Sequence, residues 1–332
     1  MSIFSNKNIL VTGGTGSIGS GIVRKLLQYG PKVIRIFSND EDSLFYLREE
    51  LQDYTHLRFL VGDVRDKERL AMAAKSIDFI FHAAALKHVP LCEYNPFEAV
   101  KTNVLGTQNV IDVAMEEKVE KVITISTDKA VNPINVMGAT KLLAERLTTA
   151  ADYYVEKTAF SCVRFGNVLD SRGSALPLFE EQIKKGGPVT ITNPDMTRFV
   201  MTIPRAVELV LKAMEVAKGG EIFIFKMPAL RVGDLAEAMI EELAPRYGYE
   251  PGKIKVKIIG KRLREKDDEE LMTEEEAKNA YETEDMFIIS GAGNGYGLEK
   301  ASGIRYSSGD GILLTKEQVK ETLGDVLHQR GL

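Results

Sequence analysis

The chain has 332 residues, of which 44% are hydrophobic and 27% charged, and its formal net charge is −5. This length exceeds one ordinary domain, and the acidic balance gives no support for a nucleic-acid partner. The two cysteines cannot form a disulfide framework and no Cys/His cluster has metal-ligand spacing, so we expect no metal site and a reducing, cytoplasmic setting. No apolar run reaches the roughly 20 residues that a membrane span requires.

The amino-terminal segment predicts a strand, a glycine-rich loop and a helix, in that order. Residues 7–12 are β-rich and enter the strand at once, which leaves no room for a signal peptide. Gly13 allows a tight turn, Gly16 lets the backbone approach a pyrophosphate, and Gly19 permits close packing of the helix on the strand. A glycine triplet alone is often only a turn, but this context predicts a dinucleotide-binding loop at a helix amino terminus. The residues assigned to the loop are Gly13, Gly16, Ser17, Ile18 and Gly19.

Further apolar runs alternate with helical segments along the chain. They lie at residues 33–37, 57–61, 79–83, 122–126 and 159–165, and a run at 221–226 should rejoin the same sheet. This alternation predicts an α/β fold, a Rossmann-like doubly wound parallel sheet with a smaller α/β substrate-binding domain. We predict a dinucleotide-binding domain at residues 1–165 plus about 199–228, and a substrate-binding domain at 166–198 plus about 229–332.

The second strand ends where a dinucleotide would place its adenosine ribose. Ser38, Asn39 and Asp40 lie about 20 residues beyond Gly19. An acid at this point favours the free 2'-hydroxyl of NAD, and an arginine favours the 2'-phosphate of NADP. Acidic residues follow and no arginine accompanies them, so the sequence favours NAD. Ser38 and Asn39 could still donate to a phosphate, which leaves NADP open.

Three further positions are candidates for cofactor contacts. Asp63 and Val64 follow the third strand, where Asp63 could meet the adenine edge or cap the next helix. Ala83 and Ala84 close the fourth strand, and their small side chains would let a cofactor press against the backbone. Lys87 in the next loop could bind a phosphate or a sugar hydroxyl, or could simply be an exposed charge.

The stretch from residue 126 to 141 concentrates reactive side chains at the carboxyl end of a predicted parallel strand, where open α/β sheets bind ligands. Thr127, Asp128 and Lys129 place a hydroxyl, a carboxylate and an amine side by side. Met137 and Lys141 lie one turn apart on the helix that follows. In isolation this stretch would be a solvated turn with a helix cap. The preceding glycine loop makes it a candidate active site.

Beyond residue 165 the strand–helix alternation weakens. We expect loops around Asn167 and Arg172, a helix at 176–184, a strand fragment at 190–192 and a loop at 193–199 that carries Arg198. Arg172 and Arg198 are candidates for a diphosphate, because guanidinium groups suit phosphate oxygens. A helix should cover 204–217. The charge run at 261–276 is most simply a solvated helical face.

These motifs together resemble the extended short-chain dehydrogenase/reductase superfamily, and within it the inverting UDP-N-acetylglucosamine 4,6-dehydratases of surface-sugar pathways. The resemblance covers nearly the whole chain and is carried by TGGTGSIG, GDVRD, HAAALKHVP, KTNVLGTQNV, STDKAVNPINVMGATK, RFGNVLDSRGS, NPDMTRF, GGEIF and YSS. The family's RxGEK element appears with Arg262 and Glu265 retained and Arg264 in place of glycine. It implies a UDP-sugar substrate that contacts Lys87, Asn167, Arg172, Arg198, Arg262 and Glu265, tightly held NAD or NADP, and a homo-oligomer, either a dimer or a hexamer.

The resemblance also implies roles in catalysis. Lys129 would remove the C5 proton and Asp128 would protonate the departing C6 hydroxyl. Thr127 would orient the C4 oxygen, and Lys141 would hold the nicotinamide ribose. To act as a base Lys129 must be neutral part of the time, and we expect the positive charges of Lys141 and of the oxidised nicotinamide to lower its pKa. Met137 stands where most of the superfamily has a tyrosine base, so Asp128 becomes the stand-in. Alternatives are a UDP-sugar 4-epimerase and an inactive cofactor-binding relative.

Overall fold

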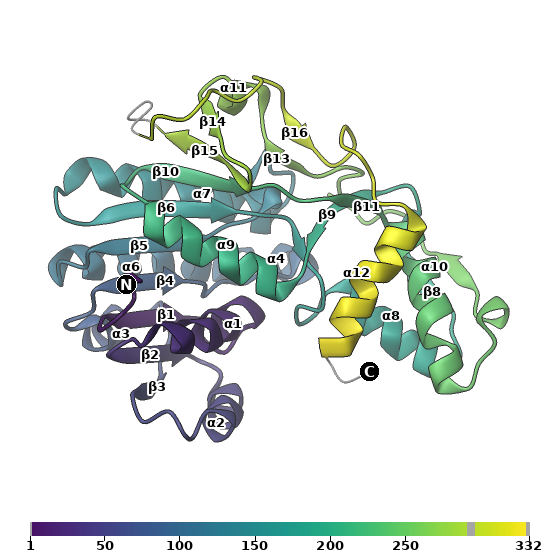
Figure 1. Cartoon of the computed structure of the whole chain (residues 1–332), viewed down its shortest axis with the longest axis horizontal. Coiled ribbons are helices and arrows are strands. Elements are labelled where there is room, and N and C mark those ends of the chain that lie inside the picture. Colours follow the sequence, from purple (N-terminus) through teal and green to yellow (C-terminus); the bar gives the residue numbers. More distant parts are fainter. Residues whose placement is uncertain (1, 291–295, 330–332) are drawn as a thin grey trace.

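The computed structural model describes residues 2–290 and 296–329, and its centre is a nine-stranded sheet (Figure 1). Every strand from β10 to β3 runs parallel, and β15 and β14 extend the sheet in antiparallel pairing. The doubly wound parallel sheet is therefore confirmed. In spatial order the strands are β14 (Ala280–Glu282), β15 (Met286–Ser290), β10 (Glu221–Phe225), β6 (Ala159–Arg164), β5 (Lys121–Ile125), β4 (Phe79–His82), β1 (Asn8–Thr12), β2 (Val33–Ser38) and β3 (Leu57–Val61).

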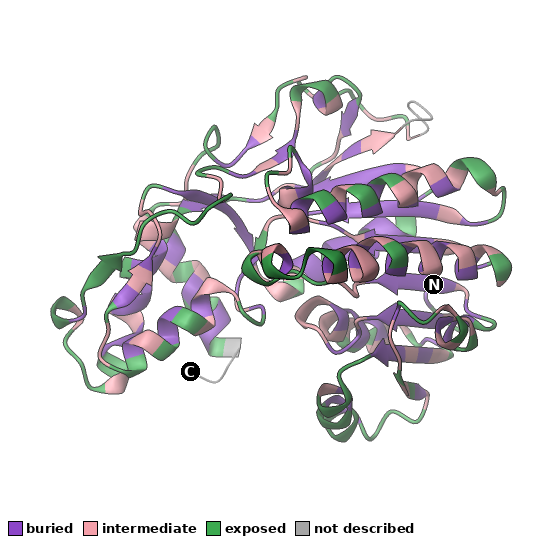
Figure 2. Ribbon diagram, turned by 180° about the vertical axis from the view of Figure 1, so that it is seen from behind, coloured by how far each residue is buried: buried purple, intermediate pink, exposed green. Residues whose placement is uncertain are grey.

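Helices cover both faces of this sheet, as Figure 1 and the reverse view in Figure 2 show. On one face α1 packs against α9, and on the other α6 packs against both α3 and α7. The strands between them are buried along most of their length, because parallel strands carry apolar side chains on both faces. The helices are α1 (Ser17–Leu26), α2 (Glu41–Glu50), α3 (Lys67–Ala74), α6 (Gly106–Glu116), α7 (Val136–Ala151) and α9 (Ile203–Val216).

A second lobe is built around three helices, α8 (Ala175–Lys184), α10 (Val232–Leu243) and α12 (Lys316–Gln329). Their apolar faces share one cluster of buried side chains with β8 (Val189–Ile191), which pairs in parallel with β12 (Val256–Ile258). A three-stranded sheet joins this lobe to the large sheet (Figure 1). Its strands are β11 (Ala229–Arg231), β9 (Thr197–Met201) and β7 (Asn167–Val168).

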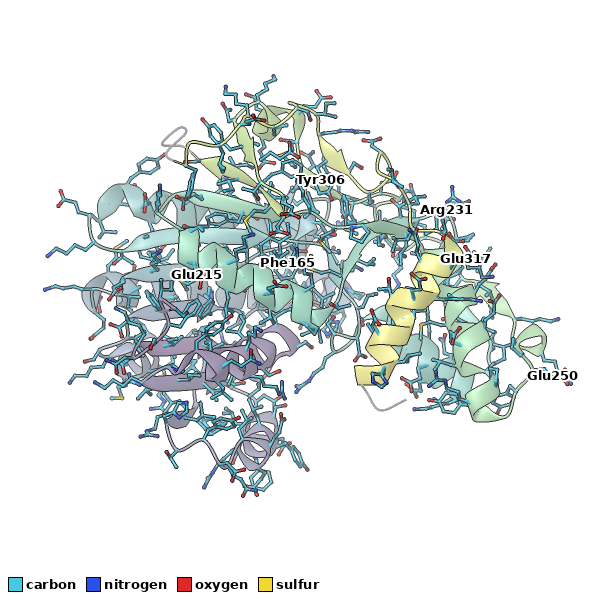
Figure 3. The ribbon with its side chains drawn as sticks, viewed as in Figure 1. Phe165, Glu215, Arg231, Glu250, Tyr306 and Glu317 are labelled. Carbon is cyan, nitrogen blue, oxygen red and sulfur yellow. The ribbon has the colours of Figure 1, made fainter. Side chains whose placement is uncertain are left out.

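Tyr306 links the carboxyl-terminal segment to the large sheet (Figure 3). Its hydroxyl donates to the Met227 carbonyl at 2.7 Å and accepts from the Met227 amide at 2.8 Å. The ring lies 4.8 Å from the ring of Phe199 on β9 and 5.4 Å from that of Phe287 on β15. Tyr306 begins the two-residue strand β16 (Tyr306–Ser307), which pairs with β13 (Glu270–Met272).

Three sequence-based expectations differ from the structure. Arg198 lies on strand β9 rather than in a loop, because residues 197–201 pair with β11 and β7. The charge run is not a helical face: it contains a loop, strand β13 and the short helix α11 (Glu274–Ala277). Strands β14 and β15 fall in the range assigned to the second domain, yet they extend the large sheet. Residues 291–295 and 330–332 of that range lie outside the described residues, and the domain division stays a prediction.

The helical segment that follows β4 is interrupted. It is divided into α5 (Pro96–Ala99), a π-helical turn (Val100–Leu105) and α6, and the helix α4 (Val89–Tyr94) precedes it. Within the π turn, the Asn103 amide pairs with both backbone groups of Leu86 at 2.7 and 2.9 Å. Unusual helical turns often position a polar side chain in this way. None of the described helices is both long and apolar enough to cross a membrane.

Candidate functional site

The glycine loop lines a cavity of about 410 Å³ at the carboxyl edge of the sheet, between β1, β2 and β4. Gly13 has a φ of 62°, and a Cβ there would lie 2.7 Å from the Ala84 amide nitrogen, so only glycine fits. A Cβ on Gly19 would lie 2.2 Å from the Gly13 carbonyl oxygen. Gly16 caps α1 without a side chain, which leaves the amides of the first turn free for an anion. These features suit a dinucleotide pyrophosphate. Ser17 and Ile18 open the helix.

The adenosine end of this cavity contains an arginine that the sequence did not place there. Arg172, from the loop after β7, reaches Ser43 with its Nη1 atom 3.0 Å from the hydroxyl and lies 3.8 Å from the Asp40 carboxylate. Asp40 caps α2, and the bonds from the Ser43 hydroxyl and amide hold its pKa below the usual range. No arginine directly follows the second strand in sequence, but the fold brings Arg172 beside Asp40 from a distant loop. Arg172 lines this cavity rather than the second one described below.

Asp63 forms the far wall of the same cavity. It accepts two side-chain bonds from Arg65, at 2.7 and 3.0 Å, and one from the Asn39 amide at 3.2 Å. The Arg65 side-chain bond is the largest cause of the lowered pKa of Asp63, so the carboxylate stays charged. Ser38 pairs with Thr15 at 2.8 Å. The other predicted cofactor residues that line this cavity are Val64, Ala83 and Ala84.

The acid and the amine of the 126–141 stretch lie directly after β5. Asp128 begins a single 3-10 turn (Asp128–Ala130), and its amide bonds to the Phe165 carbonyl at 3.1 Å, which fixes the turn against β6. The Thr127 hydroxyl donates to Asp128 Oδ1 at 2.7 Å, and Lys129 Nζ donates to the same oxygen at 3.0 Å. Asp128 is 0% exposed, and its Oδ2 has no hydrogen-bond partner among the described residues.

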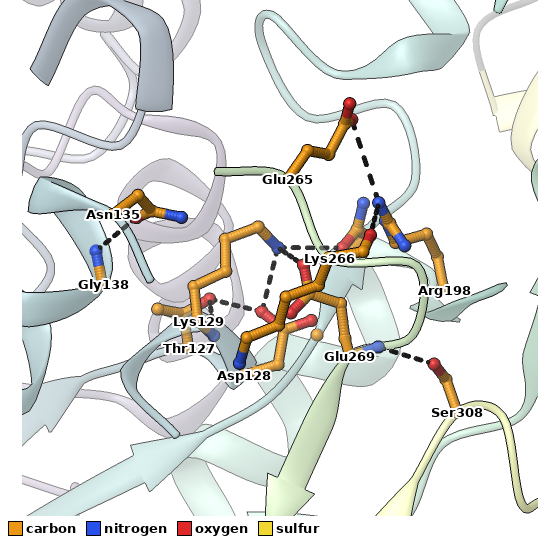
Figure 4. A network of polar contacts seen from close by, with 12 residues as sticks. Thr127, Asp128, Lys129, Asn135, Gly138, Arg198, Glu265, Lys266, Glu269 and Ser308 are labelled. Atoms are coloured by element: carbon orange, nitrogen blue, oxygen red, sulfur yellow. Dashed lines mark hydrogen bonds and ion pairs between the residues drawn. The ribbon is translucent and has the colours of Figure 1, made fainter. Parts of the chain in front are cut away.

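Lys129 lies between two carboxylates, as Figure 4 shows, and no sequence motif had indicated the second one, Glu269. Glu269 Oε1 is 3.4 Å from Lys129 Nζ. Burial lowers the pKa of Lys129, but attraction to Asp128 and Glu269 outweighs it, so the pKa is raised above its ordinary value of 10.5. Lys141 does not lower the pKa of Lys129 as expected, because the pKa is raised and its charged neighbours are Asp128, Glu269 and Arg198. Glu269 was overlooked because it lies in a charge run that pattern alone assigns to solvent.

Helix α7 holds the remaining predicted residues against this turn. The Asn135 side chain caps the helix by accepting from the Gly138 amide at 2.8 Å. A Cβ on Gly138 would lie 2.2 Å from the Lys129 carbonyl oxygen, so glycine is required for this close approach. Lys141 Nζ donates to the Ile125 carbonyl at 2.6 Å, and burial lowers its pKa. Met137 is 3% exposed and packs in an apolar cluster with Cys92 and Ala99.

A second, larger cavity of about 880 Å³ opens above Lys129, between the sheet and the second lobe. Charged and polar side chains cluster where it meets Lys129, and apolar side chains from α8, β8 and α10 line its other end. Such a site suits a ligand with one charged and one flat apolar part. The predicted substrate residues on its wall are Lys87, Asn167, Arg198, Arg262 and Glu265, joined by Glu269.

Arg198 and Arg264 fix the loop that closes this cavity. The Arg198 guanidinium donates to the carbonyls of residues 197, 266 and 267 at 2.7–3.0 Å, so it anchors the loop. Arg264 pairs with Glu93 on α4 and has a φ of 63°, a value that favours glycine. Glu93 also accepts from the Val136 amide at 2.6 Å. Among the described residues, no group of three or more His, Cys, Asp and Glu side chains could hold a metal ion.

Comparisons with known proteins identify the family to which this chain belongs. The family model described as polysaccharide biosynthesis protein matches residues 9–291. A protein of Methanocaldococcus jannaschii, described as an uncharacterized membrane protein, is 62% identical over 98% of this chain and 97% of its own. The inverting UDP-N-acetylglucosamine 4,6-dehydratase of Campylobacter jejuni is 44% identical over 87% of this chain and 84% of its own. A UDP-glucose 4-epimerase of Rickettsia canadensis is 42% identical over 86% and 84%.

Among solved structures, Pen from Bacillus thuringiensis superposes with a TM-score of 0.91 at 47% identity, and covers 97% of this chain and 98% of its own. The DesIV dTDP-glucose 4,6-dehydratase of Streptomyces venezuelae, at 22% identity and a TM-score of 0.69 over 77% of this chain and 85% of its own, shares the fold. The chain belongs to the polysaccharide biosynthesis protein family and, with it, to the extended short-chain dehydrogenase/reductase enzymes that its motifs resemble.

Proposed function

We propose that this protein is a C5-inverting 4,6-dehydratase that acts on UDP-N-acetylglucosamine for surface polysaccharide or glycan biosynthesis. The observation that carries the proposal is the 3.0 Å contact between Lys129 Nζ and Asp128 Oδ1 at the wall of the larger cavity. An amine and a carboxyl group at one point can remove one proton and supply another. The likeness to the Campylobacter jejuni dehydratase supports the same substrate class.

The loop of Gly13, Gly16 and Gly19 would hold a nicotinamide dinucleotide, and this group would supply reversible hydride transfer at sugar C4 and C6. Asp40 favours the free ribose hydroxyl of NAD, while Arg172 suits the 2'-phosphate of NADP. We also propose a homo-oligomer, a dimer or a hexamer, which light scattering on the purified chain would test.

The side chains of the 126–141 stretch then share the proton transfers. Asp128 takes the C4 hydroxyl proton and passes it to the C6 oxygen, which leaves as water. The Oδ2 atom of Asp128 has no hydrogen-bond partner among the described residues, and this supports the role. A buried carboxylate oxygen without a donor can accept a hydrogen bond from a substrate hydroxyl. Thr127 orients the C4 oxygen. Lys129 removes the C5 proton, and a proton returned from the opposite face inverts that centre. Met137 cannot carry a proton, so one carboxylate serves two steps.

The test is incubation with UDP-N-acetylglucosamine in deuterium oxide, followed by NMR of the product. We expect a 4-keto-6-deoxy sugar, inverted at C5 and carrying solvent deuterium there. Lys129→Ala and Asp128→Asn should each lower the rate by roughly 10²–10⁴-fold. Lys185→Ala, which removes an exposed lysine of the second lobe, should leave it unchanged. Turnover without solvent label at C5 would reject the mechanism.

A UDP-sugar 4-epimerase is the second candidate, and the name of the Rickettsia canadensis relative favours it. That reaction needs oxidation at C4 but neither loss of water nor a base at C5. Its product would keep the C6 hydroxyl and would take up no solvent deuterium at C5. The same NMR spectrum therefore separates the two candidates.

A further inference from the structure

Glu269 is a buried carboxylate to which the steps above assign no task. It lies on the wall of the larger cavity and is 4% exposed. Its backbone is fixed by two bonds with Ser308, in which the Ser308 amide donates to the Glu269 carbonyl at 2.8 Å and the Glu269 amide donates to the Ser308 hydroxyl at 2.9 Å. Its Oε2 has no hydrogen-bond partner among the described residues. A rigid backbone thus presents a carboxylate with one oxygen unengaged.

The proposed chemistry creates a need at Lys129 that the other described groups do not meet. Lys129 gains a proton from C5 in each turnover and must lose one before the next. Three side chains lie within reach of its Nζ: Asp128 Oδ1 at 3.0 Å, Glu269 Oε1 at 3.4 Å and Asn167 Oδ1 at 3.4 Å. The Asn167 amide cannot take up a proton, and Asp128 is already engaged in carrying the proton from C4 to C6. Of these three side chains, Glu269 is therefore the one that can accept the proton from Lys129.

We propose that Glu269 is a positioning residue that holds the Lys129 amine over the cavity and accepts its proton in each turnover. The inference rests on the proposed dehydratase function. In the step, an N–H bond of the Lys129 ammonium breaks and its electron pair stays on nitrogen. An O–H bond forms on Glu269, and no electrons are transferred. The proton then leaves to the solvent through the open cavity.

The charges around Glu269 are consistent with this role. Burial is the largest cause of its raised pKa, which makes it a readier acceptor than an exposed glutamate. Asp128, on the turn after β5, also raises its pKa. Three cations lower it: Lys129 on the same turn, Arg198 on β9 and Lys266 on the closing loop. Groups from three elements thus act on the pKa of Glu269, and burial and Asp128 together outweigh the three cations.

Glu269→Gln tests the proposal, with Glu270→Gln as the matched control because Glu270 contacts Asn132 away from the cavity. The first readout is the pH dependence of Lys129 acylation, followed by mass spectrometry on the protein without sugar nucleotide. Since the glutamine amide of the Glu269→Gln variant carries no charge, the Lys129 titration should move down by about one unit or more. The second readout is turnover of UDP-N-acetylglucosamine. We expect kcat to fall roughly 100-fold while KM changes less than about threefold.

Glu269→Asp keeps the charge and should recover part of kcat, and Glu270→Gln should match the parent in both readouts. If the midpoint pH of Lys129 acylation falls in the Glu269→Gln variant but kcat is unchanged, the proposal is overturned, because the carboxylate would then only attract the amine. A loss of kcat with an unmoved titration would overturn it as well. If the parent protein turns over no sugar nucleotide, the proposed dehydratase function is wrong. The acylation readout is independent of that result: an unchanged midpoint pH in the Glu269→Gln variant would reject the interaction between Glu269 and Lys129.

Discussion

Replacing Arg164 by methionine should destabilise this protein by about 3–5 kcal/mol. Arg164 lies on β6 and is 1% exposed. Its guanidinium binds both carboxylate oxygens of Glu145 on α7, at 2.7 and 3.0 Å, and both of Glu276 on α11, at 3.0 Å. A fifth donor contact reaches the Leu271 carbonyl at 2.9 Å. The side chain therefore fastens the carboxyl-terminal segment to the helix that carries Lys141.

The magnitude follows from what the substitution leaves behind. Glu145 is 0% exposed, so loss of the guanidinium leaves a buried carboxylate without a cation, and breaking a buried pair from one side costs about 3–5 kcal/mol. Folded proteins are stable by only about 5–15 kcal/mol in total. Because Glu276 and Glu269 belong to one short segment, the same change should also loosen the wall of the larger cavity.

Urea unfolding followed by circular dichroism measures the loss. Lys185→Met, which breaks an exposed ion pair with Glu181, should leave the midpoint unchanged. The triple variant with methionine at 145, 164 and 276 should recover much of the stability, because apolar side chains can replace a buried ionic group. An Arg164→Met variant within about 1 kcal/mol of the parent, or a triple variant no better than the single one, would refute the reasoning.

Three further predictions concern the site. Gly13→Ala should abolish dinucleotide binding in a fluorescence titration, because its Cβ would collide with Ala84; binding at the parent affinity would contradict the geometry. Arg172→Gln should weaken NADP about tenfold or more while changing NAD little, and equal losses would show that Arg172 reads no phosphate. The raised pKa of Lys129 means that its neutral fraction grows with pH, so kcat/KM should rise from neutral to alkaline pH. The Lys129 ammonium stabilises the folded state because its pKa is raised there. This contribution is fully present below the unfolded pKa near 10.5 and is lost as the pH rises through the folded pKa, so melting curves recorded over that range should show the loss.

Local pattern predicted the parts of the fold that are set by neighbours in sequence. The apolar runs that became the parallel strands are short and mostly buried, and such runs predict strands wherever helices alternate with them. The glycine loop was predictable for the same reason, because tight turns and helix termini use few residue types. Helix α7, which was expected to carry Met137 and Lys141, begins at Val136 and is capped by Asn135.

Contacts between distant segments could not be predicted in this way. More than a hundred residues separate Arg172 from Ser43, and Glu269 from Lys129, and no local periodicity marks either Arg172 or Glu269. The charge run that contains Glu269 looks solvent-exposed in sequence, yet the folded chain buries one of its carboxylates against Lys129.

The sequence by itself thus determined the sheet, the glycine loop and the adjacent acid and amine, because each depends on residues within one turn or strand. Tertiary structure alone decided which charges surround that amine and how its pKa shifts. Electrostatic interactions act through space and depend on burial, and both are known only once distant segments have packed together.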